Sequence, residues 1–388
     1  MKRKQLVSLL LSLVLLAGLV PLTAHAEDPD WALLVDGVPV RESNCDDILG
    51  NGVFSYVQNE IVKDEGVQYE RILYIRGDYT GQSGKPLIEN RKLSGLTVWA
   101  DAPSALTNAG TVILSHVDLT VTGFKGLTLT SENGSCVVMD SGAGLTLDCL
   151  RMKAVAKDVA VSGSGTSEKL DIGTSLLDLE GGSAAVRGFD GDLTMQKTSA
   201  YQEPTAAKIQ GGAIVEDKVI APAVLKKLRI TTNADYDQDG EVEAEDLFQI
   251  ILMLSYEFKE LFQLIDLDNE SNIAQMLPEL ISSLGVAKSI RLLTLIPKYD
   301  FDRNKNPGRG DYQVLLDRIY AEGELQNVAV SVYDPDSDQC SGLFMFQRAT
   351  DRSLKEYSNF FENVTDCRVF ILGDGFVPLQ AATDIHHD

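Results

Sequence analysis

Short strand-like triplets that begin and end with an apolar residue recur along residues 71–209. The first series is Leu96-Thr97-Val98, Leu119-Thr120-Val121, Leu145-Thr146-Leu147, Leu170-Asp171-Ile172 and Leu193-Thr194-Met195, at intervals of 23, 26, 25 and 23 residues. A second series follows at a similar step: Val112-Ile113-Leu114, Val137-Val138-Met139, Val159-Ala160-Val161 and Ala184-Ala185-Val186. Gly, Ser, Asn and Asp separate the triplets, which is typical of turns. Short strands at a near-constant interval predict the rungs of a solenoid.

The fold class that we expect for this region is a right-handed β-solenoid, or β-helix. One rung cannot bury its inward side chains alone, so rungs must stack on their neighbours. An all-β sandwich is the alternative, but it does not require a constant interval. A solenoid also needs a cap at its start, which residues 31–56 could supply.

The hydrophobic period becomes helical after residue 246. Apolar residues there fall on one helical face, at Leu247, Ile250, Ile251 and Leu254, then Ile273, Met276, Leu277, Leu280 and Ile281, and finally Tyr312, Leu315, Leu316 and Ile319. Pro297 is expected to end one of these helices. Residues 328–333 and 367–372 again read as strands, and we expect a small β-sandwich-like module at the end of the chain.

The first 26 residues have the pattern of a cleavable signal peptide. A basic start is followed by an apolar run from residue 6 to 22 and by the small-x-small site Ala24-His25-Ala26. We therefore expect a secreted protein, with no membrane span after cleavage, that could also be held at the cell surface. The predicted division is 1–26 signal peptide, 27–225 solenoid with its cap, 226–324 calcium-binding helical module and 325–388 C-terminal β module.

Composition excludes some classes of function. The chain has 34 basic and 57 acidic residues, a net charge of −23, and removing the three basic residues of the signal makes it −26. Such a charge repels nucleic acid. Of the four His residues, only His116 lies inside the expected mature chain away from its tail, so catalysis that depends on a His base is not expected. Cys340 and Cys367 could form a disulfide between two strands of the C-terminal module.

Residues 235–246 have the residue types of a calcium loop. Calcium binds six to eight oxygens, and alternate residues of a tight 12-residue loop can supply them. The candidate ligands are Asp235, Asp237, Asp239, the backbone carbonyl of Glu241, and Asp246. Gly240 stands at the sixth position, where the loop must turn sharply.

Residues 300–311 repeat this pattern. The candidate ligands here are Asp300, Asp302, Asn304, the carbonyl of Asn306, and Asp311. Lys305 replaces the glycine of the sixth position, which should strain the turn, and Pro307 replaces the apolar residue of the eighth. Ca²⁺ is accordingly the one cofactor predicted. Ordinary acidic turns that cap helices are the alternative.

Paired loops that end in Asp and lead directly into a helix resemble dockerin modules. The resemblance implies two bound calcium ions and docking to a cohesin-type scaffold protein. The chain departs from that pattern in the long gap between residues 246 and 300 and in Ala244-Glu245 and Arg309-Gly310, at positions that carry much of cohesin recognition. Residues 33–40 and 46–56 resemble the opening of solenoid domains of exported Gram-positive proteins that are labelled carbohydrate-binding.

The function predicted from these features is an exported, non-catalytic protein. Its solenoid would present a surface, with polysaccharide as the candidate ligand and Trp99 and Tyr79 as candidate sugar-stacking residues. A β-helix polysaccharide lyase or hydrolase is one alternative, but the rung residues Asp140, Asp148, Asp171, Asp178 and Asp190 show no carboxylate pair at a fixed spacing. An adhesin or scaffold with structural calcium is the other.

Overall fold

The structure is a computed structural model. It describes residues 31–63, 66–243, 246–247, 249–250, 253, 277–305, 309–319, 326–334, 339–349, 367–372 and 378–385. The predicted signal peptide and the helical pattern of residues 254–276 lie outside these residues. Within them, no helix combines the length and the apolar character that crossing a membrane requires.

Residues 71–195 form a β-solenoid of about five turns, as the spacing predicted. The five triplets of the first series lie in β7 (Leu96–Ala100), β10 (Leu119–Ser131), β12 (Gly144–Ala156), β14 (Lys169–Ile172) and β17 (Asp192–Met195). These strands are parallel, and their register places the five leading leucines in a single file. Each of these leucines is at most 8% exposed. Burying one leucine in this way contributes about 2 kcal/mol, and stacking repeats that contribution on every rung.

The second series forms another wall of the coil. Its strands are β6 (Ile88–Asn90), β9 (Ile113–Ser115), β11 (Val137–Met139), β13 (Val159–Gly163) and β16 (Ala184–Arg187). Ile113 pairs with Val137, and Val137 pairs with Val161. Val161 in turn pairs with Val186, so the paired residues of this wall follow one another at steps of 24 or 25 residues.

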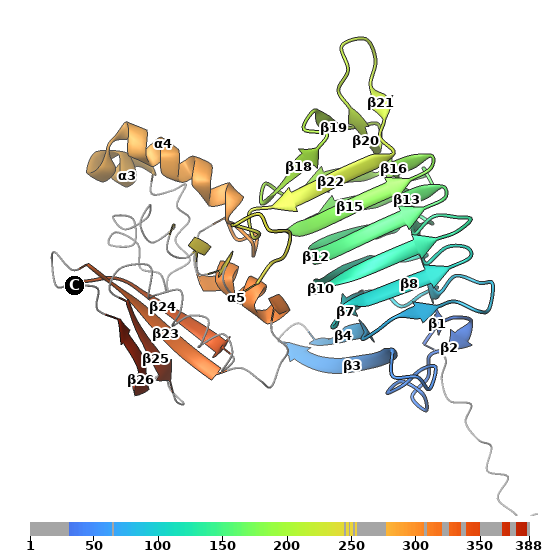
Figure 1. The fold of residues 1–388 in the computed structure, drawn as a ribbon, viewed down its shortest axis with the longest axis horizontal. Coiled ribbons are helices and arrows are strands. Elements are labelled where there is room, and N and C mark those ends of the chain that lie inside the picture. Colours follow the sequence, from blue (N-terminus) through green and yellow to red (C-terminus); the bar gives the residue numbers. More distant parts are fainter. Residues whose placement is uncertain are drawn as a thin grey trace, which may run out of the picture.

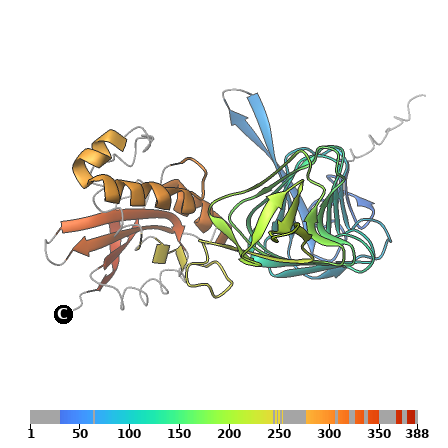
Figure 2. The same ribbon diagram turned by 90° about the horizontal axis from the view of Figure 1, so that it is seen from above.

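A third wall runs through β5 (Tyr79–Thr80), β8 (Ser104–Asn108), the second halves of β10 and β12, β15 (Ser175–Gly181) and β22 (Lys227–Thr232). Figure 1 shows these strands stacked side by side, and Figure 2, from above, shows the rungs enclosing the core. β22 pairs with β15 and so adds one further strand to the end of this wall.

Antiparallel strands close both ends of the coil. At the start, β1 (Leu33–Val35) pairs with β6 and with β2 (Val38–Pro39), and β3 (Phe54–Lys63) forms a hairpin with β4 (Gly66–Ile75). At the other end, β22 runs antiparallel to β15 and to β18 (Ser199–Glu203). A small sheet of β19 (Ala207–Gln210), β20 (Ala213–Glu216) and β21 (Ala223–Val224) follows β18. In the third wall β22 thus takes the place of a next rung, whereas β16 and β17 are the last strands of the other two walls.

The helical and C-terminal parts follow the solenoid. The helices are α3 (Leu277–Leu284), α4 (Val286–Leu295) and α5 (Arg309–Ile319), and a short 3-10 helix, η1 (Ile296–Lys298), contains Pro297 and ends α4 as predicted. Four antiparallel strands form the last sheet in the order β24 (Gln339–Ala349), β23 (Gln326–Asp334), β25 (Cys367–Leu372) and β26 (Pro378–Ile385). A second, sandwich-like layer remains a prediction.

Candidate functional site

Residues 235–246, called loop 1 from here on, fold around their own carboxylates. Oxygens of Asp235, Asp237 and Asp239 all lie within 4.8 Å of one another. Asp246 is 1% exposed, and its two oxygens accept hydrogen bonds from the backbone N–H groups of Tyr236 (2.7 Å), Asp237 (3.3 Å) and Glu243 (3.0 Å). The loop therefore closes on Asp246, at its twelfth position.

Residues 300–311, called loop 2, close in the same way. Asp311, also 1% exposed, accepts from the N–H groups of Phe301 (2.8 Å) and Asp302 (3.3 Å). The first position of each loop accepts from the sixth, since the N–H of Gly240 lies 3.2 Å from Asp235 Oδ2 and that of Lys305 lies 3.1 Å from Asp300 Oδ1. Two segments separated by more than 50 residues thus share one hydrogen-bond pattern, which supports their being repeats of one motif.

Backbone dihedral angles strengthen this equivalence. The fourth position has a positive φ in both loops, 64° at Gln238 and 65° at Arg303, and so does the sixth, 92° at Gly240 and 69° at Lys305. Glycine adopts such angles without a steric penalty, whereas a residue with a Cβ atom does not. Lys305 therefore occupies a strained position, as its replacement of glycine predicted.

Burial and mutual repulsion disfavour the ionised carboxylates. Burial raises the pKa of Asp235 and Asp300, and neighbouring acids of each loop add to the effect. Burial also raises the pKa of Asp246 to about 7, against the hydrogen bonds that it accepts. Oδ1 of Asp235 is buried and has no hydrogen-bond partner within the described part of the chain. A divalent cation would supply the missing partner and offset the repulsion.

The predicted ligands are only partly brought together. In loop 2, oxygens of Asp300, Asp302 and Asp311 lie within 4.8 Å of one another. In loop 1 the compact group consists of Asp235, Asp237 and Asp239, and Asp246 is not part of it. The Asn304 side-chain amide donates to Asp302 (2.8 Å). Asn306 and Pro307 lie outside the described residues, as do Ala244 and Glu245.

Both loops contact the solenoid, which the sequence did not predict. From loop 1, Glu241 forms an ion pair with Arg151 of β12 at 2.9 Å. From loop 2, the carbonyl of Asp300 accepts from the Gln196 amide at 2.6 Å. The helix after loop 2 also takes part, because the guanidinium of Arg318 lies 4.5 Å from the centroid of the Trp99 ring.

Arg303 of loop 2 contacts two carboxylates of the solenoid. Its guanidinium hydrogen-bonds Asp171 and lies 3.7 Å from Asp148. Asp148 also accepts from the backbone N–H of Thr174 and of Cys149, and its pKa is raised by burial and lowered by Arg303. Two rung carboxylates thus converge, but on an arginine. We therefore assign them to the attachment of loop 2.

The two candidate sugar-stacking residues, Trp99 and Tyr79, make different contacts within the protein. The Trp99 ring is next to Tyr74 (centroids 5.8 Å apart) and has Arg318 above it. Tyr79 packs against the core, and its hydroxyl donates to Asp36 at 2.8 Å. Sugar stacking by either residue remains a prediction, with these contacts as competitors for the rings.

The two cysteines of the predicted bridge lie on different strands of the C-terminal sheet. Cys340 of β24 pairs with Tyr333, and Cys367 of β25 pairs with Val332, on opposite sides of β23. Two strand spacings, about 9.6 Å, separate such positions, and a disulfide spans Cα atoms at most about 7 Å apart. The Cys340–Cys367 bridge stays a prediction, and this register is the observation that weighs against it. Cys45, Cys136 and Cys149 are free.

Comparison with protein-family models, with curated proteins and with solved structures finds no significant match to this chain. The dockerin-like and carbohydrate-binding resemblances therefore rest on the motifs alone.

Proposed function

We propose that the chain is an exported, non-catalytic β-solenoid protein in which two calcium ions order loops 1 and 2 and so attach the helical module to the solenoid. The carrying observation is the shared loop geometry. Both loops close on a buried Asp at position 12 and gather carboxylate oxygens within 4.8 Å, and loop 1 leaves Oδ1 of Asp235 without a partner. Hard oxygen donors in a tight loop suit calcium better than softer metals.

The contacts with the solenoid support a role for the ions in attachment. Arg303 and Gln196 join loop 2 to the solenoid, and Glu241 joins loop 1 to it. Without a cation, three carboxylates in each loop repel one another. Calcium would remove that repulsion and hold the loop backbone in the conformation from which these side chains reach the rungs. A cohesin-type partner, the expectation from the dockerin resemblance, would have to bind a module that is already in contact with its own solenoid.

Secretion and surface presentation complete the proposal. The signal-like start supports export, where millimolar calcium is available and oxygen-rich loops of moderate affinity are filled. The solenoid presents long, regular walls to solvent, which suits the binding of an extended polymer.

Calcium titration of the purified full chain, read out as melting temperature, tests the calcium proposal. We expect a rise in melting temperature in the wild type, a smaller rise in Asp235→Ala and in Asp300→Ala, and none in the double variant. Glu132→Ala removes an exposed acid outside the loops and should behave like the wild type. A wild type that melts at the same temperature in chelator and in excess calcium would overturn the proposal.

A further inference from the structure

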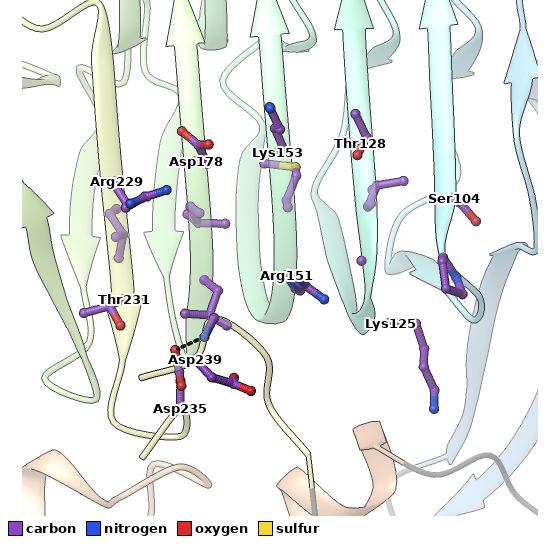
Figure 3. A pocket seen from close by; sticks show the side chains of 18 of the residues that line it. Ser104, Lys125, Thr128, Arg151, Lys153, Asp178, Arg229, Thr231, Asp235 and Asp239 are labelled. Atoms are coloured by element: carbon purple, nitrogen blue, oxygen red, sulfur yellow. Dashed lines mark hydrogen bonds between the residues drawn. The ribbon is translucent and has the colours of Figure 1, made fainter. Parts of the chain in front are cut away.

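A groove of about 800 Å³ lies between the third wall of the solenoid and loop 1 (Figure 3). Its floor is formed by β8, β10, β12, β15 and β22, and residues 235 and 238–240 of loop 1 contribute to its lining. The groove thus crosses successive rungs and has one of the two candidate calcium loops at its edge.

Basic side chains gather in this groove although the chain as a whole is strongly acidic. Lys125, Arg151, Lys153 and Arg229 line it, and the net charge of the chain is −23. Arg151 is paired with Glu241. Lys125, Lys153 and Arg229 are exposed and form no ion pair with the residues that the structure describes. These three cations are available to a negatively charged ligand.

Acidic side chains in the same groove offset the charge of these cations. Asp78, Asp178, Asp235 and Asp239 also line it, so four acidic side chains balance the four basic ones. Two of these acids, Asp235 and Asp239, are candidate calcium ligands. One divalent ion bound in loop 1 would change the net charge of the groove lining from zero to +2.

The register gives the charges a regular spacing. Lys153 is paired with Asp178, and Asp178 is paired with Arg229, so the two cations stand two strands apart on one line across the wall. Figure 3 shows Thr128 and these three side chains on neighbouring strands. At a strand spacing of about 4.8 Å, the two cations lie about 10 Å apart along the stack. A straight, stiff polymer with anionic groups at a fixed repeat matches such a line.

The remaining lining favours a saccharide over other polyanions. Ser104, Thr128, Thr231 and Gln202 add hydroxyl and amide groups between the charges, and sugar hydroxyls can hydrogen-bond all of them. No aromatic side chain is among the described lining residues, so nucleic-acid bases find no stacking platform there. The floor strands already pair on both sides, which leaves no edge to which a peptide strand could add.

We infer that the groove binds an acidic polysaccharide, with its carboxylates on Lys153 and Arg229, and that calcium in loop 1 is required for binding. The calcium requirement rests on the function proposed above, whereas the basic line of the groove does not. The inference names the ligand class for the surface that the solenoid presents.

Binding of a short, fluorescently labelled oligogalacturonate to the full chain, measured by anisotropy at low ionic strength in calcium, tests the inference. The double variant Lys153→Gln/Arg229→Gln should bind about tenfold more weakly or worse, a loss of about 1.4 kcal/mol or more, because it removes both cations that face the ligand carboxylates. The matched control Lys92→Gln/Lys157→Gln removes two exposed cations outside the groove and should bind like the wild type. Rising salt should weaken wild-type binding.

Several results would overturn the inference. These are equal binding of the methyl-esterified oligomer, equal weakening in the control variant, or no binding although calcium raises the melting temperature. If poly-glutamate binds as tightly as the oligogalacturonate, the ligand class is an acidic peptide and not a saccharide. If binding persists in chelator while calcium still stabilises the chain, the calcium requirement fails. If the basic residues are needed but calcium leaves the melting temperature unchanged, the groove stands and the proposed calcium function fails.

Discussion

The attachment of loop 2 to the solenoid can be tested by replacing Arg303 with alanine. The side chains of Arg303, Asp148 and Asp171 are 40%, 26% and 32% exposed, so this cluster lies between a surface ion pair and a buried one. Exposed pairs contribute up to about 1 kcal/mol, and breaking a buried pair costs about 3–5 kcal/mol. We therefore expect Arg303→Ala to lower the free energy of unfolding by about 1–2 kcal/mol.

The effect should depend on pH with a defined sign. Burial and the like charge of Asp171 raise the pKa of Asp148, and Arg303 lowers it, so removing Arg303 raises this pKa further. Between the unfolded and the folded pKa, the native variant holds a proton that the unfolded chain has lost. Its stability therefore falls as pH rises through this window. The difference in the free energy of unfolding between Arg303→Ala and the wild type should be largest near neutral pH and should become smaller toward about pH 4 to 5.

Fluorescence offers a local readout of this attachment. The chain has two tryptophans, and Trp99 lies under Arg318 of α5. In a Trp31→Phe background, urea unfolding followed by Trp99 emission reports the contact between α5 and the solenoid. The matched control Arg187→Ala breaks a 3.5 Å pair with Asp158, both about half exposed, and should cost less than about 0.5 kcal/mol. If Arg303→Ala costs no more than this control at neutral pH, the attachment that we describe is wrong.

Three further predictions concern the rungs and the loops. Gly163→Ala and Gly188→Ala should each lower the melting temperature strongly, because a Cβ at either residue would clash with the backbone oxygen of the other. The control Gly110→Ala places its Cβ in open space and should leave the melting temperature nearly unchanged in thermal circular dichroism. Lys305→Gly should stabilise the chain by about 1 kcal/mol in urea unfolding, because it removes a Cβ from a residue with φ of 69°; a loss of stability would contradict the strain. Because the pKa of Asp246 is raised to about 7, the stability of the metal-free chain should fall as pH rises from about 4 to 7. The calcium-induced rise in melting temperature should grow over the same pH range, and an equal rise at about pH 4 and at about pH 7 would refute this prediction.

The solenoid was predictable because its determinants are local and repeated. The Leu-x-Val triplets mark one strand per rung, and their spacing alone identifies partners such as Leu119 and Leu145. The second series was less predictable in detail, because Val137 pairs with Val161 and not with Val159, and a run of apolar residues does not mark which of them is paired. The antiparallel closing strand β22 was missed, since its alternation resembles that of any rung.

The loops were predictable as oxygen-rich turns, but their contacts were not. Alternating Asp residues and Gly240 identify the loop from the sequence. Arg303 stands at the same place in loop 2 as Gln238 does in loop 1, and nothing in the sequence links it to Asp171, 132 residues away. The groove likewise depends on the fold, because Lys153 and Arg229 come onto one line across the wall only when β22 pairs with β15. Contacts between distant segments require the register, which the sequence pattern does not supply.

Amide hydrogen exchange of loops 1 and 2, with calcium and with chelator, tests the calcium-ordered attachment most directly. The N–H groups of Tyr236, Gly240, Phe301 and Lys305 all donate to loop carboxylates. We predict that calcium protects these four amides and that chelator exposes them while the solenoid amides stay protected. Equal exchange of these amides in calcium and in chelator would contradict the account.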